Sequence, residues 1–155
     1  MPVRRRQTGS WPPIQQAFHT ACLQAGFGTT NDKNGRHPTG LGVSPSNNID
    51  GVRMSTALTH LNPVRHHLNL TVRGGVFARK ILIKHGKAVG VEAESGGKVF
   101  RVEADKVVLS SGAIRSPHLL MLSGIGPEDQ LQQFGIPAVH HLPGVGSNLV
   151  NHLSA

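Results

Sequence analysis

The apolar positions at the start of the chain have helical spacing and then lose all periodicity. Apolar residues recur every third or fourth position over residues 12–26, which predicts an amphipathic helix that starts at two prolines and ends at a glycine. Residues 28–51 show no pattern, so we expect a long loop, and loops of this length usually serve function. A short helix is expected over 55–61, with Ser55 as N-cap and with Asn62-Pro63 as its stop. The apolar face of the first helix comprises Ile14, Ala17, Phe18, Ala21, Cys22 and Ala25.

The middle of the chain changes to a period of two, which is typical of β-strands. Apolar and polar residues alternate in runs separated by glycines, and Gly-Gly at 96–97 between two such runs is a strong hairpin signal. We expect an antiparallel meander from this region. The predicted strands cover 68–72, 76–84, 88–95 and 98–104.

A buried strand followed by two helices is expected after the meander. Residues 106–110 are a short apolar run, and a helix is predicted from Ser116-Pro117 to Ser123 with Gly124 as its cap. A second short helix covers about 128–134. The order of helix, loop, meander, strand and helix predicts an α/β or α+β fold rather than an all-β fold.

Composition and charge narrow the possible partners. The chain has 155 residues, which suits one domain, and its 19 glycines against 4% aromatic residues indicate many turns or backbone that approaches a ligand. The net charge of +8 raises the expectation of an anionic partner, but the cations are dispersed and the only tight run is Arg4-Arg5-Arg6. We therefore expect no nucleic-acid partner. A basic nucleic-acid-binding module, or an adaptor without catalysis, is the alternative interpretation.

The single cysteine and the ten histidines do not predict a metal site. Cys22 lies on the apolar stripe of the first helix, where a buried inert thiol is expected, and one cysteine excludes an internal disulfide. The histidine pairs 66–67 and 140–141 are adjacent in sequence, so their side chains diverge. No apolar run approaches the ~20 residues that cross a bilayer and no secretory signal is present, so we expect a cytoplasmic protein without a membrane span.

Residues 107–117 carry the strongest chemical signal in the chain. An apolar strand runs into a turn of small residues at 110–113, whose backbone N–H groups could come close to a ligand. A helix that starts at Ser116 would present unpaired N–H groups and a positive dipole end to phosphate. In open α/β sheets, ligands bind beyond the carboxyl ends of strands, where this turn lies. The alternative is an ordinary strand-to-helix connection.

The same segment resembles the second signature of the glucose–methanol–choline (GMC) oxidoreductase family. That signature requires a small pair, a Ser-Pro, two aliphatic residues and Ser-Gly-aliphatic-Gly at fixed spacing, and residues 112–127 meet each position. The resemblance can be followed over about residues 12–152. Further matching stretches are 32–35, 51–56, 69–72, 87–92, 135–137 and 142–149.

The resemblance implies a flavoenzyme that binds FAD in a Rossmann-like domain and oxidises a small alcohol to a carbonyl. This chain would be an internal α/β (α+β) fragment of it, combining part of that domain, with a β-meander, and part of the substrate-binding cap. The implied regions are a disordered tail (1–11), part of the cap (12–67), part of the FAD domain (68–135) and a linker back toward the cap (136–155). The implied cofactor-binding residues are Ala78, at the adenine end, together with Ser111, Gly112, Ala113, Ser116 and Pro117.

The sequence departs from the family pattern at both ends. It has no Gly-x-Gly-x-x-Gly turn after a first strand, and it ends before the position of the family's catalytic histidine. His152 stands where the family commonly has Asp-His, but Asn151 precedes it, and that motif is not the catalytic one. We therefore assign no catalytic residue, expect N- and C-terminal segments of the same enzyme to be missing, and expect the isolated chain to be inactive.

Overall fold

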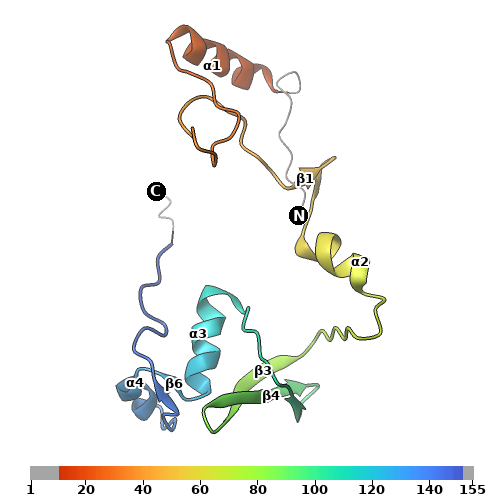
Figure 1. Cartoon of the computed structure of the whole chain (residues 1–155), viewed down its shortest axis with the longest axis vertical. Coiled ribbons are helices and arrows are strands. Elements are labelled where there is room, and N and C mark those ends of the chain that lie inside the picture. The colour runs from red at the N-terminus through yellow and green to blue at the C-terminus, as the bar shows by residue number, and fades with distance from the viewer. Residues whose placement is uncertain (1–10, 152–155) are drawn as a thin grey trace. The chain divides into compact units, whose positions relative to one another are not determined.

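The computed structural model describes residues 11–151, and these divide into two compact units with the boundary between Val72 and Arg73. The expected disordered tail apart from Trp11, the arginine run at 4–6 and His152 lie outside the described residues. The elements of both units are drawn in Figure 1. Helices and strands both occur, so the predicted mixed α/β class is confirmed.

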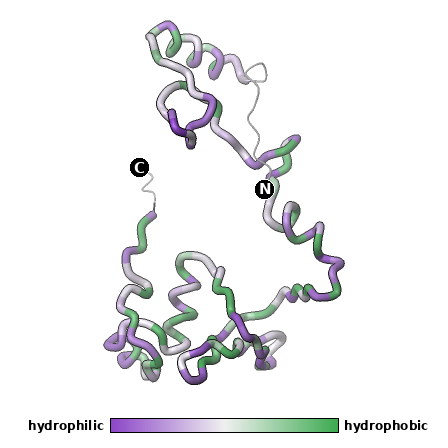
Figure 2. Tube along the Cα trace, in the orientation of Figure 1, coloured by the Kyte–Doolittle hydropathy of each residue, from purple (hydrophilic) through white to green (hydrophobic). Residues whose placement is uncertain are grey.

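The first unit begins with the predicted amphipathic helix, α1 (Pro13–Gln24). It ends as predicted, because Gly26 has a φ of +85° and the N–H of Phe27 donates back to the carbonyl of Cys22 at 3.1 Å. Hydrophobic and hydrophilic residues alternate around this helix (Figure 2), yet none of its residues is buried. Ile14 is 76% exposed and Phe18 is 66% exposed. Cys22 is half-buried, so the expected fully buried thiol is wrong.

The expected long loop contains a small hairpin that the sequence analysis missed. Strands β1 (Asn48–Ile49) and β2 (Val52–Arg53) pair antiparallel across Asp50 and Gly51. Both turn residues have positive φ, +49° and +82°, which a type I′ turn requires. Asp-Gly is a standard sequence for this turn, so the signal was present in the sequence.

The next helix continues through the proline that was expected to stop it. A π-helix, η2 (Ala57–Leu61), runs directly into α2 (Asn62–Val64), with Pro63 inside. The N–H of Asn62 reaches back five residues to the carbonyl of Ala57. Pro63 has no N–H and its ring would collide with the carbonyl four residues earlier, and the wider π turn relieves that collision. Ser55 does act as a cap, since its Oγ accepts the N–H of Leu58 at 3.4 Å.

The second unit is built on the predicted meander. Strands β3 (Phe77–Lys84), β4 (Lys87–Ser95) and β5 (Lys98–Glu103) form an antiparallel sheet in the order β3-β4-β5. Paired positive φ values at 85–86 and 96–97 give the two tight turns their twist. These three strands are confirmed with small differences at their ends.

Helices and a second small sheet complete this unit. Helix α3 (Gly112–Leu122) packs on β3 and is followed by β6 (Ile125–Gly126), α4 (Glu128–Gln133) and β7 (His140–His141). The parallel β6–β7 pair falls partly in a region expected to be loop. Within the described residues, the buried apolar side chains all belong to this unit. They are Ile81, Ala93, Leu119, Leu131 and Val145.

Two predicted strands are absent from the described structure. Residues 68–72 and 106–110 are irregular, and Leu68 and Val108 are 104% and 86% exposed. A strand exists only when its backbone N–H and C=O groups pair with a neighbour, and residues 11–151 pair no strand with either segment. Of the described helices, none has the length and the apolar character that crossing a bilayer demands.

Candidate functional site

The small-residue turn leads straight into α3, earlier than predicted. Gly112 is the first helical residue and has a φ of +83°, which lets the chain turn sharply after Ser111. The predicted start at Ser116 is therefore wrong. The hydroxyl of Ser116 lies inside the helix and accepts the N–H of Ser111 at 3.1 Å, which fixes the turn.

Because α3 starts at Gly112 and not at Ser116, the unpaired N–H groups of its first turn belong to the small-residue turn. Because Ser111 is the N-cap, the N–H groups of residues 112–114 have no intrahelical acceptor, and the N–H of Ser111 itself is bound by Ser116. Pro117 adds to this, because it cannot donate to the carbonyl of Ala113. The N–H groups at the start of α3 and the carbonyl of Ala113 are therefore available to other hydrogen-bond partners.

One buried hydroxyl joins α3 to the sheet. Ser123 is 7% exposed, and its Oγ donates to the carbonyl of Leu119 at 2.6 Å. The same oxygen accepts the backbone N–H of Ile81, on β3, at 2.8 Å. The helix and the strand are therefore held side by side at this point.

The glycines of the Ser-Gly-Ile-Gly run allow a close approach of backbone. Gly124 has a φ of +81°, and a Cβ on it would lie 2.5 Å from the carbonyl oxygen of Pro137. Its own carbonyl accepts N–H groups from Val139 and His140 at 2.7 and 3.1 Å. This half of the signature thus serves packing.

Two of the predicted site residues lie on one small cavity, which we call the Ala78 cavity. It has a volume of about 320 Å³ and combines the start of β3 with α3. Ala78 and Ser111 are far apart in sequence, and both line it. Its lining residues are Val76, Phe77, Ala78, Ser111, Arg115, His118 and Leu119.

Two more predicted residues line a second cavity, which we call the Pro117 cavity. Ala113 and Pro117 border it together with residues 146–150, and its volume is about 730 Å³. Gly112 and Ser116 line neither cavity. An added Cβ at Gly112 would have no atom within 4 Å, so open space lies in front of this backbone.

Sequence reasoning did not select the two residues that line both cavities, Arg115 and His118. They are three residues apart on α3, a spacing that places side chains on one helix face, so the signal was available in the signature itself. Neither cavity is lined by a carboxylate. Arg115 and His118 therefore place a guanidinium and an imidazole ring at the border of two cavities that have no other charged lining residue.

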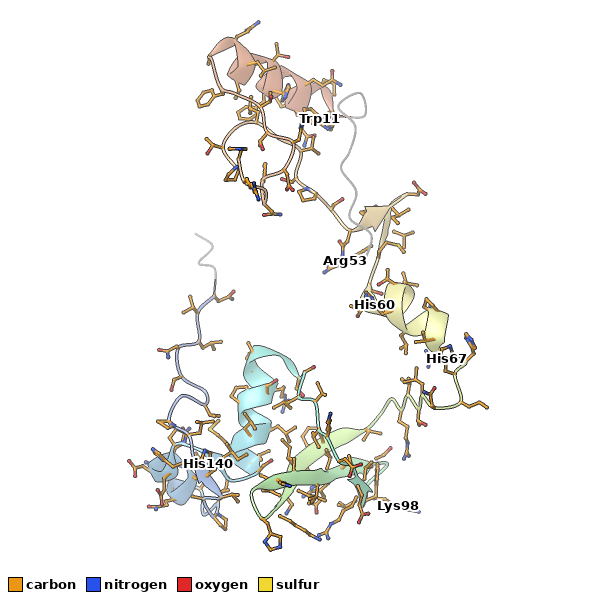
Figure 3. The ribbon with its side chains drawn as sticks, in the orientation of Figure 1. Trp11, Arg53, His60, His67, Lys98 and His140 are labelled. Atoms are coloured by element: carbon orange, nitrogen blue, oxygen red, sulfur yellow. The ribbon has the colours of Figure 1, made fainter. Side chains whose placement is uncertain are left out.

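The histidines flagged in the sequence do not gather into a metal site within the described part of the chain. No three His, Cys, Asp or Glu side chains of residues 11–151 could hold one ion. The rings of His66 and His67 lie edge to face, 4.7 Å apart, and Figure 3 labels His60, His67 and His140 at separate places along the chain. His60 instead contacts Thr59 through Nδ1 at 2.7 Å.

Comparison with known proteins assigns the family. Residues 1–154 match the model of the GMC oxidoreductase family. The oxygen-dependent choline dehydrogenase of Photobacterium profundum is 49% identical over 142 residues, covering 91% of this chain and 25% of that protein. The mitochondrial choline dehydrogenase of Homo sapiens is 42% identical over 153 residues, covering 98% of this chain and 26% of that protein.

Solved structures show the same relationship. Pyridoxine 4-oxidase from Mesorbium loti matches with a TM-score of 0.80 and 30% identity, over 92% of this chain and 28% of that chain. An FAD-dependent oxidoreductase from Chaetomium thermophilum matches with a TM-score of 0.81 and 27% identity, over 92% and 25% of the two chains. The chain thus spans about a quarter of the length of these relatives, as the prediction of a fragment requires, and its fold is part of theirs. By its sequence and its fold, the chain belongs to the GMC oxidoreductases, a family of oxidoreductase enzymes.

Proposed function

We propose that this chain is part of an FAD-dependent enzyme that oxidises the CH–OH group of a small alcohol to a carbonyl. The observation that carries the proposal is the Ala78 cavity, where the small-residue turn at Ser111 meets the start of β3. The choline dehydrogenases among the relatives support an alcohol substrate, and the FAD-dependent neighbour from Chaetomium thermophilum supports the cofactor.

The described residues fit one end of such a cofactor. The Ala78 cavity, at about 320 Å³, is at the small end of the ~300–1,000 Å³ range of ligand pockets, so it suits the adenine end rather than a whole dinucleotide. The open space before Gly112 and the unpaired N–H groups of residues 112–114 offer room and donors to the neighbouring part of the ligand. We propose Ala78, Ser111, Gly112, Ala113, Ser116 and Pro117 as the residues that shape this wall.

The contribution of this chain is positioning. A bound flavin would supply the hydride-accepting chemistry, and the protein supplies orientation and electrostatics. Gly112 and Ala113 would bring the backbone against the ligand, while Ser116 would act indirectly, by holding the N–H of Ser111. We name no base for the hydroxyl proton, and we propose that the isolated chain is inactive. We also propose residues 12–67 as part of the substrate cap, 68–135 as part of the FAD domain and 136–155 as the linker back toward the cap.

Titration of FAD into the ¹⁵N-labelled chain tests the proposal. We expect the amide signals of Ala78 and of residues 111–113 to shift, with an affinity too weak for a stoichiometric complex, because the sequence has no Gly-x-Gly-x-x-Gly turn to bind the pyrophosphate. Shifts confined to the first unit, or no shifts, would contradict the proposed site. A tight one-to-one complex would contradict the expected weakness.

A further inference from the structure

Met121 is a side chain of α3 that contacts two other parts of the second unit. A Cβ placed on Gly126, in β6, would lie 3.0 Å from the Cγ of Met121 and 3.8 Å from its Sδ. A Cβ placed on Gly146 would lie 3.6 Å from its Cε. The thioether therefore passes between two stretches of backbone without side chains, and it joins α3 to β6 and to the segment that follows β7.

The thioether is accessible from two cavities. Met121 is half-buried, and it lines the Pro117 cavity. It also lines an apolar cavity of about 510 Å³ between α3 and α4, which we call the Phe134 cavity. Both cavities open to solvent, because strongly exposed residues border them, Val150 at 87% and Phe134 at 73%. A small oxidant can therefore reach the sulfur without unfolding of the chain.

The surroundings of the sulfur suit a thioether and not a sulfoxide. The Cδ2 of Leu131, which is 1% exposed, lies 3.8 Å from the same Cβ position on Gly126 as the sulfur does. Val145, which precedes Gly146, is 9% exposed. Oxidation of methionine turns a flexible apolar side chain into a polar one. Because burial of a polar group without a hydrogen bond costs free energy, the S–O group should turn toward solvent and leave the two glycines.

We propose that Met121 is a site of reversible oxidation by peroxide, and that its sulfoxide releases the segment around Gly146 from α3. The lone pair of Sδ attacks one oxygen of hydrogen peroxide, so that an S–O bond forms and the O–O bond breaks. The other oxygen leaves as hydroxide and takes the proton of the transferred OH group, which gives one water. The sulfur loses two electrons and the peroxide gains them.

Release of this segment would change the Pro117 cavity. Residues 146–150 form one side of the cavity, and Ala113 and Pro117 belong to the other side, on α3. The inference goes beyond the proposed function and does not depend on it, because it needs only the contacts of Met121 and an oxidant. Methionine sulfoxide reductases reverse the modification, so the change is a switch and not only damage.

The test adds dilute hydrogen peroxide to the ¹⁵N-labelled 155-residue chain, and mass spectrometry of its peptides locates each added oxygen. We expect sulfoxide at Met121 while the sheet signals of Ile81 and Ala93 keep their folded positions. The amide signals of Gly126 and of residues 145–148 should shift. Treatment with both methionine sulfoxide reductases, one for each epimer, should restore the original spectrum.

Variants identify the residue responsible. Met121→Leu removes the sulfur with little change of volume, and the amides of 145–148 in this variant should not respond to peroxide. Met121→Gln places a polar group there without oxidation, and its untreated spectrum should already show shifts at 145–148. Met54→Leu is the matched control, because Met54 is also half-buried but lines neither cavity, and this variant should respond like the original chain. Met1 lies outside the described residues.

Three results would overturn the inference. The site is wrong if Met121 stays unmodified at every peroxide concentration that leaves the chain folded. The release is wrong if the Met121 sulfoxide forms and the amides of 145–148 keep their positions. The assignment to Met121 is wrong if Met121→Leu responds at 145–148 as strongly as the original chain does.

Discussion

The hydroxyl of Ser123 accepts the backbone N–H of Ile81 at 2.8 Å, across 42 positions of sequence. Ile81 lies on β3 and Ser123 follows α3, so this bond sets how the helix lies against the strand. Ala78 is on the same strand and Ser111 precedes the same helix. The geometry of the Ala78 cavity therefore depends on a hydrogen bond between two residues that do not line it, one of them in the packing half of the family signature.

Ser123→Ala should destabilise the second unit by about 1–3 kcal/mol, because it leaves the N–H of buried Ile81 without an acceptor. Urea denaturation followed by circular dichroism measures the loss. Ser147→Ala is the control, since the exposed Ser147 hydroxyl also donates to a carbonyl, that of Pro143, and its removal should cost less than about 0.5 kcal/mol. Equal stability of the two variants would mean that the Ser123 bond does not hold the helix.

Gly124→Ala should cost more stability than Gly135→Ala. Both glycines have positive φ, +81° and +66°, so each substitution carries the left-handed penalty of roughly 1–2 kcal/mol. Only at Gly124 does the new Cβ meet backbone, the carbonyl of Pro137, and the collision should add about 1–3 kcal/mol. The difference in urea midpoints between the two variants isolates the close approach, and a difference of zero would argue against it.

Pro63→Ala should convert the π turn into regular α-helix. The alanine restores an N–H and removes the ring that forces the bond from Asn62 back to Ala57. Carbon chemical shifts and amide protection over residues 57–64 report the change. Persistence of the five-residue bond in the variant would show that something other than Pro63 widens this turn.

Amide hydrogen exchange should be slow in the described elements that contain buried residues and fast in those that do not. Ile81 and Ala93 are 8% and 4% exposed within a paired sheet, whereas α1 has no buried residue. Amides protected by a packed core open only with global unfolding, so we expect slow exchange in β3 and β4 and fast exchange in α1. Exchange in α1 as slow as in β4 would contradict this division.

Elements defined by local chemistry were predictable from the sequence. The meander follows from alternation and glycine turns, and the end of α1 follows from Gly26, because each needs only neighbouring residues. The irregular structure of segments 68–72 and 106–110 was not predictable, because a strand needs a partner strand and the local sequence pattern does not show whether one is present. The hairpin at Asp50-Gly51 was missed although its turn signal was present.

The site was predictable only in part, for a related reason. The signature selected residues 111–117, but Ser-Pro was interpreted as a helix start, whereas Ser116 reaches back to Ser111 from inside α3. The sequence analysis did not select Arg115. Its significance appears only when the fold places it between two hollows without a carboxylate to pair with.

The most direct test of the proposed cofactor site is a chimera in which part of this chain replaces the matching part of a relative. Residues 73–151 would replace the matching stretch of the Photobacterium profundum choline dehydrogenase, to which the chain is 49% identical, and the flavin content of the purified chimera would be measured. We expect a chimera that folds cooperatively, retains bound FAD, and loses it when Gly112 and Ala113 are both replaced by bulky residues. A chimera that folds cooperatively but purifies without flavin would contradict the assignment of this segment as a cofactor wall.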